Sequence, residues 1–432
     1  MRIVVGIGGG IAAYKACMVI REFTKAGHDV IAIPTAAARN FIGDATLEAL
    51  TGNPVSATVF DGVPEVRHVQ VGAQADLVVV VPATADLLGR IANGAANDML
   101  TTTLLMATCP VLLAPAMHTQ MWENRLVQHN VARLRENGVT VMQPDVGRLT
   151  GPDSGAGRLP EPAEIAEMAL SLMEEGATYP QDLAGRRLVV SAGGTQEAID
   201  PVRYLGNRSS GLQGVALAAC AAQRGADVTL VLGANSLPYT PAGVTVRQVT
   251  SARDMLHAIE AELGVQPDAQ PVSPELGGAG TADAPAIEPV DAPVDALIMA
   301  AAVADFRPAE VADVKLKKGA TSEPDRIDLL RNPDILASVV DGATRPHVTV
   351  GFAAETGDAT RSVLELGRVK LQRKGCDLLM VNEVGFDKTF GQPVNGGWLL
   401  GKDGSEQQVP ESSKRAVAQR ILNAVVELLS EE

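Results

Sequence analysis

The stretch RIVVGIGGGIAAYKA, residues 2–16, decides the fold of the first part of the chain. Its Val and Ile residues predict a buried strand at 2–8, and the glycines after it predict a tight turn. A helix is expected from about Ile11 to Ala26, where Gly27 ends it. Three further strands rich in apolar residues are expected at 29–35, 75–84 and 110–117.

The same pattern begins again near the middle of the chain. RRLVVSAGG at 186–194 predicts a strand and a second glycine turn, and the helix after it is expected at 213–224. We therefore predict an α/β protein of two doubly wound, mostly parallel-sheet Rossmann-like domains, residues 1–180 and 186–432, joined by a polar stretch at 174–185. Further strands of the second domain are expected at 226–234, 295–305, 347–356 and 376–384.

The composition agrees with two aliphatic cores in an acidic protein. The 432 residues exceed what one core usually serves, and 46% of them are apolar but only 3% aromatic. A net charge of −15 disfavours nucleic acid and anionic membranes as partners. No apolar run approaches the ~20 residues of a membrane span, the first strand leaves no room for a signal peptide, and the four cysteines show no CxxC spacing. We therefore expect a cytoplasmic protein.

Residues 266–294 belong to neither predicted core. They are rich in Pro, Ala and Gly and carry five acidic residues and no basic one. Such a segment buries too little apolar surface to offset the entropy lost on ordering. We predict a disordered insertion in the second domain that serves as a spacer.

The first glycine turn is typical of an anion site, because backbone N–H groups at the start of a helix attract a phosphate. Gly8, Gly10 and Ala13 match a relaxed dinucleotide-binding fingerprint. A NAD site, however, needs an acidic residue at the end of the second strand, and that strand ends in Ile-Pro-Thr at 33–35. The Thr35 hydroxyl suits a phosphate or a flavin better, so we do not expect NAD.

The first domain carries a set of motifs that is specific in its combination and order. The motifs are GGGIAAYKA at 8–16, Arg67–Val69, Pro82–Asp86, Ala95–Leu100, Pro115–Met117 and Met121–Trp122. With them, residues 1–175 resemble the flavin-dependent cysteine decarboxylase family, which acts on 4′-phosphopantothenoylcysteine. The resemblance implies an FMN cofactor that oxidises the cysteine thiol, so that the carboxylate can leave as CO₂, and a histidine that handles protons.

The resemblance also implies roles for individual residues. His68 stands at the position of the histidine, although a histidine at a helix start can also be purely structural. His118 replaces the asparagine that usually holds the substrate carboxylate, and an imidazole can donate a hydrogen bond to it as well. The implied flavin contacts are Gly9, Gly10, Thr35, Ala83 and Thr84, and the implied substrate contacts are Asn97, His118 and Arg158.

The flap over the substrate departs from the family pattern. Residues 149–162 keep the glycines, Arg158 and the Pro-Glu-Pro end, but they lack the cysteine that donates a proton in the reductive half of the reaction. Thr150, Asp153, Ser154 or a water molecule replaces it, or the second half-reaction fails. We expect a complete reaction with a substitute donor.

The second glycine turn opens another ordered set of motifs. They are Asp200–Tyr204, Asn207–Gly211, Met299–Pro308, Lys315–Lys318, Asn332–Leu336 and Gly351–Thr356. With them, residues 186–428 resemble the phosphopantothenate–cysteine ligase family. The resemblance implies that CTP activates the carboxylate of 4′-phosphopantothenate as an acyl-cytidylate, with release of pyrophosphate, and that the amine of cysteine then attacks this intermediate.

Roles in this second reaction follow from the same resemblance. Lys315 is implied in forming the intermediate and Asn207 in converting it. Lys370 and Lys374 share a helix face and supply charge for the triphosphate, although a lysine pair is more often just a solvated face. Asp305 suits Mg²⁺ or Mn²⁺, and is otherwise a loop cap. The other implied substrate contacts are Met299, Ala300, Ala301, Pro333, Asp334, Ile335, Leu336 and Phe352.

Three interpretations remain open. The leading one is a bifunctional enzyme of coenzyme A biosynthesis that makes 4′-phosphopantetheine from 4′-phosphopantothenate, cysteine and CTP. The second keeps only the ligase, because the flavin domain lacks its cysteine. The third is a non-enzymatic assembly or regulatory protein of the same fold. The resemblance further implies a homo-oligomer with trimeric flavin domains and paired ligase domains, which could combine to a dodecamer.

Overall fold

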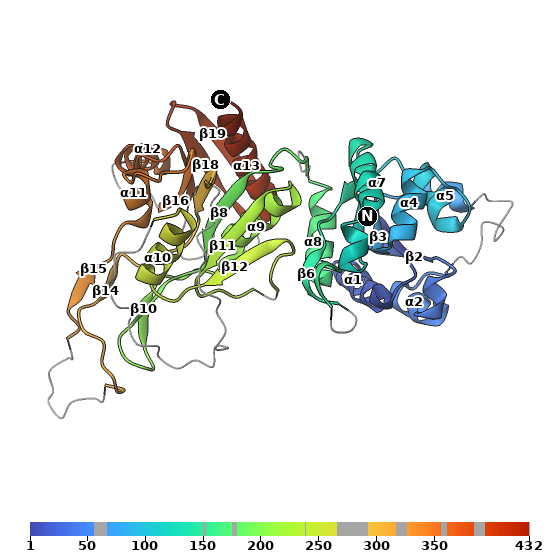
Figure 1. Ribbon diagram of the computed structural model, residues 1–432, viewed down its shortest axis with the longest axis horizontal. Helices are drawn as coiled ribbons and strands as arrows, with labels where there is room; N and C mark the ends of the chain where they lie inside the picture. Colours follow the sequence, from blue (N-terminus) through green and yellow to red (C-terminus); the bar gives the residue numbers. More distant parts are fainter. Residues whose placement is uncertain are drawn as a thin grey trace. The chain divides into compact units, whose positions relative to one another are not determined.

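The computed structural model divides the chain into two units (Figure 1). The first comprises Met1–Pro180 with Pro241–Gly243, and the second comprises Gln181–Thr240 with Val244–Glu432. Among the residues described, no helix is both long and apolar enough to cross a bilayer. The described residues are 1–55, 67–149, 153–174, 179–237, 239–265, 293–316, 326–355, 361–383 and 394–431, with the backbone alone at 67–69 and 383.

The first unit is built on a five-stranded parallel sheet in the order β2-β1-β3-β4-β5, with helices on both faces (Figure 1). Its strands are β1 (Arg2–Ile7), β2 (Asp29–Pro34), β3 (Leu77–Ala83), β4 (Val111–Pro115) and β5 (Thr140–Val141), and β6 (Asp145–Arg148) and β7 (Ser154–Arg158) form a separate hairpin. Its helices are α1 (Tyr14–Lys25), α2 (Asp44–Thr51), α3 (Arg67–Ala73), α4 (Ala85–Ala92), α5 (Met99–Met106), α6 (Thr119–Trp122), α7 (Arg125–Glu136) and α8 (Pro162–Ser171), with short 3₁₀ turns at Ile11–Ala13 and Ala38–Asn40.

Alternating side chains of β1, an interior strand, help to fill a core on each face of this sheet. Ile3 and Val5 pack with residues of α1 and α8, whereas Val4 packs with residues of α4, α5 and α7. Successive side chains of a strand point to opposite faces, so a strand that is covered on both faces is apolar throughout. This explains the unbroken Val/Ile run and confirms the predicted doubly wound arrangement. The helix after the turn ends at Lys25, and Gly27 follows with a φ of 81° as expected.

The second unit has an eight-stranded sheet in the order β12-β11-β8-β13-β16-β17-β18-β19, in which the first six strands are parallel. The strands are β8 (Arg187–Ala192), β11 (Asp227–Leu232), β12 (Val244–Gln248), β13 (Ala296–Met299), β16 (Val348–Glu355), β17 (Leu378–Glu383), β18 (Val394–Gly401) and β19 (Glu406–Ser413). The helices are α9 (Leu212–Gln223), α10 (Ala252–Glu262), α11 (Ile335–Val340), α12 (Val363–Lys374) and α13 (Lys414–Ser430).

Three details of this unit differ from the prediction. The strand expected at 295–305 ends at Met299, because the chain then leaves the sheet and the N–H of Ala302 binds the carbonyl of Gly193 at 2.8 Å. The antiparallel edge formed by β18 and β19 was not predicted. Residues 266–292 of the predicted insertion lie outside the described part of the structure. Val294, the last residue of the prediction, is buried in the core, so the insertion ends before it.

In both sheets the strand order reverses beside the strand that precedes the glycine turn. The reversal lies between β1 and β3 in the first unit and between β8 and β13 in the second. Where the order reverses, the loops that follow the two neighbouring strands lead to helices on opposite faces of the sheet. A crevice therefore opens at the carboxyl ends of these strands, and α/β proteins bind their ligands there. Each glycine turn therefore borders a crevice.

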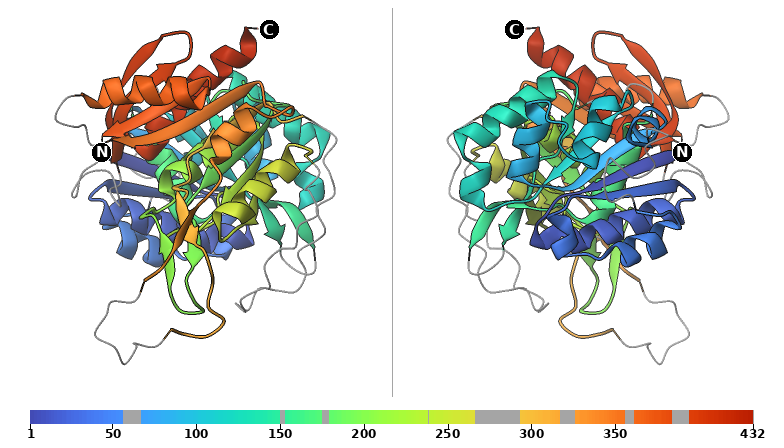
Figure 2. Two further views of the ribbon diagram at one scale, coloured as in Figure 1. Left: turned by 90° about the vertical axis from the view of Figure 1, so that its left-hand side faces the viewer. Right: turned by 90° about the vertical axis from the view of Figure 1, so that its right-hand side faces the viewer.

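Two hairpins, which we call the arm, extend side by side from the sheet of the second unit (Figures 1 and 2). One consists of β9 (Gln196–Ala198) and β10 (Tyr204–Gly206), and the other of β14 (Phe306–Pro308) and β15 (Leu329–Arg331).

A buried ion pair allows a test of the second core. The side chains of Arg187 in β8 and Glu262 in α10 are 7% and 5% exposed and contact each other. Breaking a buried pair by removing one partner costs about 3–5 kcal/mol. We expect Glu262→Ala to lower the free energy of unfolding in urea by that amount. Arg253→Ala, at an exposed position of the same helix, should change it by less than about 0.5 kcal/mol. Equal effects of both substitutions would contradict the role given to the pair.

Candidate active sites

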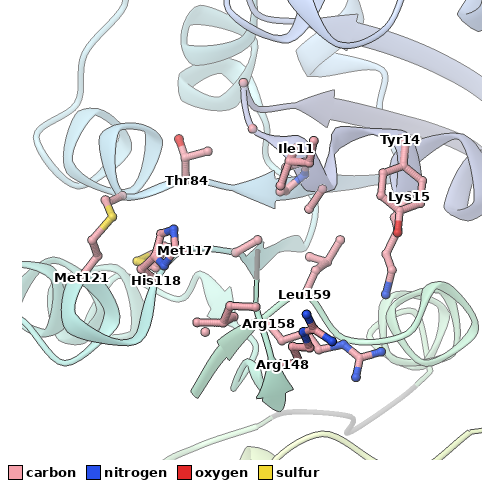
Figure 3. Close-up of a pocket in the computed structure, with 18 residues that line it drawn as sticks. Ile11, Tyr14, Lys15, Thr84, Met117, His118, Met121, Arg148, Arg158 and Leu159 are labelled. Carbon is pink, nitrogen blue, oxygen red and sulfur yellow. The ribbon is translucent and has the colours of Figure 1, made fainter. Parts of the chain in front are cut away.

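The first cavity has a volume of about 720 Å³ and lies at the carboxyl ends of β1, β3 and β4, between the glycine turn and the β6–β7 hairpin (Figure 3). Five predicted site residues line it together, namely Gly9, Gly10, Thr84, His118 and Arg158. Apolar side chains that the sequence analysis placed in motifs but gave no contact role form much of the wall, including Ile11, Met117, Met121 and Leu159. A large, mainly apolar cavity with backbone N–H groups at one side fits a flavin and its phosphate.

The glycine turn depends on residues that have no Cβ atom. A Cβ on Gly8 would stand 2.2 Å from the carbonyl oxygen of Pro82, and one on Gly9 would stand 2.3 Å from the Cβ of Ala37. At Gly10 the nearest atom, in Thr84, is 3.7 Å away, which is an ordinary contact. Gly8 and Gly9 therefore let the turn touch the neighbouring loops.

Two predicted flavin contacts do not line the first cavity. The Thr35 side chain is buried, and its hydroxyl donates to the carbonyl of Ile7 at 3.0 Å and accepts from the N–H of Ala38 at 3.2 Å. Thr35 thus holds the loop after β2 in place. Ala83 is fully buried at the end of β3, and the next residue, Thr84, is the one that faces the cavity.

The flap contributes Leu149, Gly157, Arg158 and Leu159 to the wall of the first cavity, and its Asp153, outside that lining, comes close to His118. Nδ1 of His118 is 3.9 Å from a carboxylate oxygen of Asp153, and both side chains are about half exposed. Ser154 is exposed at the start of β7, and Thr150 lies outside the described residues. None of the described residues that line the cavity is a cysteine. Asp153 is therefore the candidate replacement that the structure brings to His118.

Two further residues predicted for the first domain are not placed in this cavity. His68 is the second residue of α3, and its side chain lies outside the described part of the structure. Asn97 accepts a hydrogen bond from Arg90, which also pairs with Asp98 at 2.7 Å. Asn97 is not among the described residues that line the cavity. The roles of His68 and Asn97 stay predictions.

The second cavity, also about 720 Å³, lies at the carboxyl ends of β8, β13, β16 and β17. All substrate residues predicted for the second domain line it except Lys315. They are Asn207, Met299, Ala300, Ala301, Asp305, Pro333, Asp334, Ile335, Leu336, Phe352, Lys370 and Lys374. The parallel strand order collects these distant motifs at one edge of the sheet.

Lys370 and Lys374 each reach this cavity with an acidic partner. Nζ of Lys370 is 2.9 Å from Glu355, and Lys374 contacts Asp334. Burial opposes ionisation of Asp334, but its hydrogen bonds from Lys374 and from a backbone N–H outweigh burial and hold its pKa below the usual value. The predicted common face of the two lysines is confirmed.

The other polar residues of the motifs lie at the mouth of the second cavity. The side-chain amide of Asn207 donates to the carbonyl of Val303 at 2.9 Å. Asp305 is exposed and offers one carboxylate. The residues that the structure describes include no group of three or more His, Cys, Asp or Glu side chains able to hold a metal ion. Mg²⁺ bound to nucleotides commonly takes one or two carboxylates together with phosphate oxygens, and Asp305 fits that pattern.

Five polar residues of the second cavity were missed by the sequence analysis, namely Gln213, Arg373, Asn382, Asn395 and Lys414. Gln213 accepts from the Asn395 amide at 2.9 Å and donates to the carbonyl of Lys414 at 3.1 Å. The side-chain oxygen of Asn382 is buried and has no hydrogen-bond partner among the residues that the structure describes. Asn382 lies at the carboxyl end of β17, so the rule that such strand ends share an edge could have found it.

Lys315 lies on the arm and not in the cavity of its own unit. The buried carboxylate of Asp200 accepts from the N–H of Leu316 at 3.1 Å, and Arg203 donates to the carbonyl of Leu316 at 3.1 Å. The Arg203 guanidinium also binds Asp200 and holds its pKa well below the usual range. This clamp fixes the backbone beside Lys315, whose own side chain is exposed.

The steric role of the glycine turn can be tested with two alanine substitutions. Gly8→Ala forces a methyl group against the backbone of Pro82, and overpacking of this kind costs about 1–3 kcal/mol. We expect a fall of about 2–10 °C in the unfolding midpoint of the first unit, measured by scanning calorimetry. Gly10→Ala meets only an ordinary contact and should leave the midpoint almost unchanged. An equal loss in both variants would show that Cβ contacts do not set the turn.

Comparison with known proteins gives the same division of the chain. Residues 1–174 match the Flavoprotein family, and residues 183–268 and 285–429 match the DNA/pantothenate metabolism flavoprotein C-terminal domain. The chain is 52% identical to the coenzyme A biosynthesis bifunctional protein CoaBC of Mycobacterium tuberculosis H37Rv, over 99% of this chain and 97% of the relative. The CoaBC protein of Mycolicibacterium smegmatis is 51% identical over 100% of this chain and 98% of the relative. That of Vibrio vulnificus YJ016 is 38% identical over 99% of this chain and 98% of the relative. The chain belongs to the family of bifunctional coenzyme A biosynthesis proteins.

Proposed function

We propose that the chain joins 4′-phosphopantothenate to cysteine in its second unit and decarboxylates the product to 4′-phosphopantetheine in its first. One observation carries this proposal: all predicted ligase residues except Lys315 line one cavity, and five predicted decarboxylase residues (Gly9, Gly10, Thr84, His118 and Arg158) line the other. The product of ligation, 4′-phosphopantothenoylcysteine, is the substrate of decarboxylation. Four free cysteines agree with a reducing cytoplasm as the place of this chemistry.

Ligation takes place in the second cavity. A carboxylate oxygen of 4′-phosphopantothenate attacks the α-phosphorus of CTP, and the bond to pyrophosphate breaks. The amine of cysteine then attacks the acyl carbon of this acyl-cytidylate, and CMP leaves. Lys370 and Lys374 offset the charge of the triphosphate, Asp305 holds Mg²⁺ or Mn²⁺, and Phe352 borders the cytidine. The amide of Asn207 supports the second step.

Decarboxylation takes place in the first cavity. A cysteine carboxylate has no electron sink, and FMN, when bound, supplies one by accepting two electrons from the thiol and later returning them. The N–H groups of Gly9 and Gly10 would hold its phosphate, and Ile11 and Leu159 would contact its ring. His118 donates a hydrogen bond to the substrate carboxylate until CO₂ leaves.

The proton that completes the reaction comes from the flap. Asp153 faces His118 at 3.9 Å, and none of the described lining residues is a cysteine. Once CO₂ has left, His118 no longer holds the carboxylate, and Asp153 acts as the general acid, whose proton reaches the enethiolate carbon through the imidazole of His118. His68 remains the proposed residue for proton transfer at the thiol.

We infer that the second unit pairs with a second copy through the arm. The arm exposes many large apolar side chains, which mark interaction surfaces. Lys315 lies on the same arm outside the cavity of its own unit, so we assign it to the cavity of the partner subunit. Trimers of the first unit, and a dodecamer, rest on the resemblance alone. The exposed apolar residues of the arm include Val202, Tyr204, Leu205, Phe306, Val314, Leu316, Leu329 and Leu330.

The decisive assay incubates the purified chain with 4′-phosphopantothenate, cysteine and CTP, and separates the products. We expect 4′-phosphopantetheine, CO₂, CMP and pyrophosphate, and a yellow protein that carries FMN. Accumulation of 4′-phosphopantothenoylcysteine by a colourless protein would favour the ligase alone. No pyrophosphate release would reject the ligase function.

The role of Asn207 predicts a separation of the two steps of ligation. Asn207→Asp replaces a donor by a carboxylate that repels the acyl-cytidylate phosphate, so pyrophosphate should form while the cysteine adduct does not. Quantification of pyrophosphate and 4′-phosphopantothenoylcysteine measures this. Asn40→Asp, at an exposed position of the first unit, is the matched control and should behave as wild type. Normal ligation by Asn207→Asp would remove Asn207 from the mechanism.

The role of Asp153 predicts a separation of the two halves of decarboxylation. Loss of a general acid typically costs about 10²–10⁴-fold in rate. Asp153→Asn should therefore still release CO₂ but form 4′-phosphopantetheine more slowly by that factor, with the enethiol accumulating. Glu123→Gln, an exposed carboxylate near His118 in the chain, should leave both rates unchanged. Unaltered product formation by Asp153→Asn would point to another donor.

A further inference from the structure

The positive charge of Lys414 lies where it destabilises the ligand-free protein. It is the first residue of α13, it is half-buried, and it lines the second cavity. Burial lowers its pKa, because a charged ammonium loses hydration there. Unlike Lys370 and Lys374, it has no ion-pair partner within the described part of the chain.

The dipole of α13 disfavours the charge of Lys414 further. The start of a helix is the positive end of its dipole, where a lysine is disfavoured, and α13 has no acidic residue in its first turn. The start of α9 lies beside it, since Gln213 donates to the carbonyl of Lys414 at 3.1 Å. Farther along both helices, Arg224 donates to Gln419 at 3.1 Å. The two helices therefore run in the same direction and present their positive ends together.

The start of α9 lies where a nucleotide phosphate is expected. It follows the second glycine turn at the reversal of strand order, and no side chain caps it at Gly211. Its first turn also lacks an acidic residue. Backbone N–H groups at such a place bind phosphate in α/β proteins. An anion is thus the partner that would satisfy Lys414 and both helix ends at once.

We propose that Lys414, together with the start of α9, binds the triphosphate of CTP during ligation; the inference rests on the ligase function proposed above. Lys370 and Lys374 have carboxylate partners, Glu355 and Asp334, in the free chain, so Lys414 is the cavity lysine that gains most from an anionic ligand. When the carboxylate attacks the α-phosphorus, negative charge grows on the departing pyrophosphate. An ammonium fixed beside it stabilises that charge.

Binding measurements with two variants test the proposal. Lys414→Gln should weaken the binding of CTP by about 10- to 100-fold in calorimetric titration, as expected for a charge-assisted contact. The affinity for 4′-phosphopantothenate should stay within about twofold of wild type. Lys402→Gln, at an exposed position in the turn between β18 and β19, is the matched control and should bind CTP as wild type does.

Stability separates this role from a purely structural one. Removal of an unsatisfied cation should leave the unfolding midpoint of ligand-free Lys414→Gln at or above that of wild type, while the rise in midpoint on adding CTP becomes smaller. A structural lysine would show the opposite pattern, with a lower midpoint and an unchanged response to CTP. That pattern, or a loss of affinity for 4′-phosphopantothenate alone, overturns the proposal.

Chemical labelling of lysines tests the proposal on the wild-type chain, so the result does not depend on whether a variant folds. Lysines are acylated with and without CTP or pyrophosphate, and the modified residues are quantified by mass spectrometry. Both ligands should protect Lys414 and leave Lys402 unprotected. If wild type binds CTP and Lys414 is labelled equally in all samples, the proposal is wrong. If wild type does not bind CTP at all, the ligase function itself fails.

Discussion

Close approach of the backbone at the two glycine turns is the constraint on which both sites depend. A Cβ on Gly193, whose φ is 81°, would stand 2.6 Å from the carbonyl oxygen of Ala234. The same turn binds the N–H of Ala302 at 2.8 Å and so holds the loop that follows β13. In the first unit, Gly8 makes the corresponding approach to Pro82. The loops that line each cavity are thus fixed by contacts that only glycine permits.

The parts of the molecule that were predicted from sequence are those whose causes are local or follow from strand order. Val/Ile runs and glycine turns gave the two doubly wound sheets, because apolar strands covered on both faces leave a distinct pattern. The second cavity was predicted almost completely, since parallel strands bring their carboxyl ends to one edge. Phe352, Lys370 and Met299 therefore line the same cavity, as expected.

Two of the parts that were missed depend on contacts between distant segments. Thr35 matched a flavin ligand in type and place, but its hydroxyl is used by Ile7 and Ala38. Lys315 was expected beside the triphosphate, yet Asp200 and Arg203 hold its neighbour Leu316 on the arm. For Thr35 and Lys315 the deciding partner is remote in sequence. The antiparallel strands β18 and β19 are different, because only residues 402–405 separate them, and the Asp-Gly pair in that turn is a hairpin signal that could have predicted them.

The cysteine missing from the flap also changes how the chain meets reactive molecules. No described residue that lines either cavity is a cysteine. Cys220 and Cys376 are buried, and burial raises the pKa of Cys376 to about 11 and that of Cys17 and Cys109 above the usual value. Thiolate is the form that electrophiles and peroxides attack. An inhibitor with a thiol-directed warhead would find no anchor at the described walls, and oxidation at those walls would act on methionines such as Met117, Met121 and Met299.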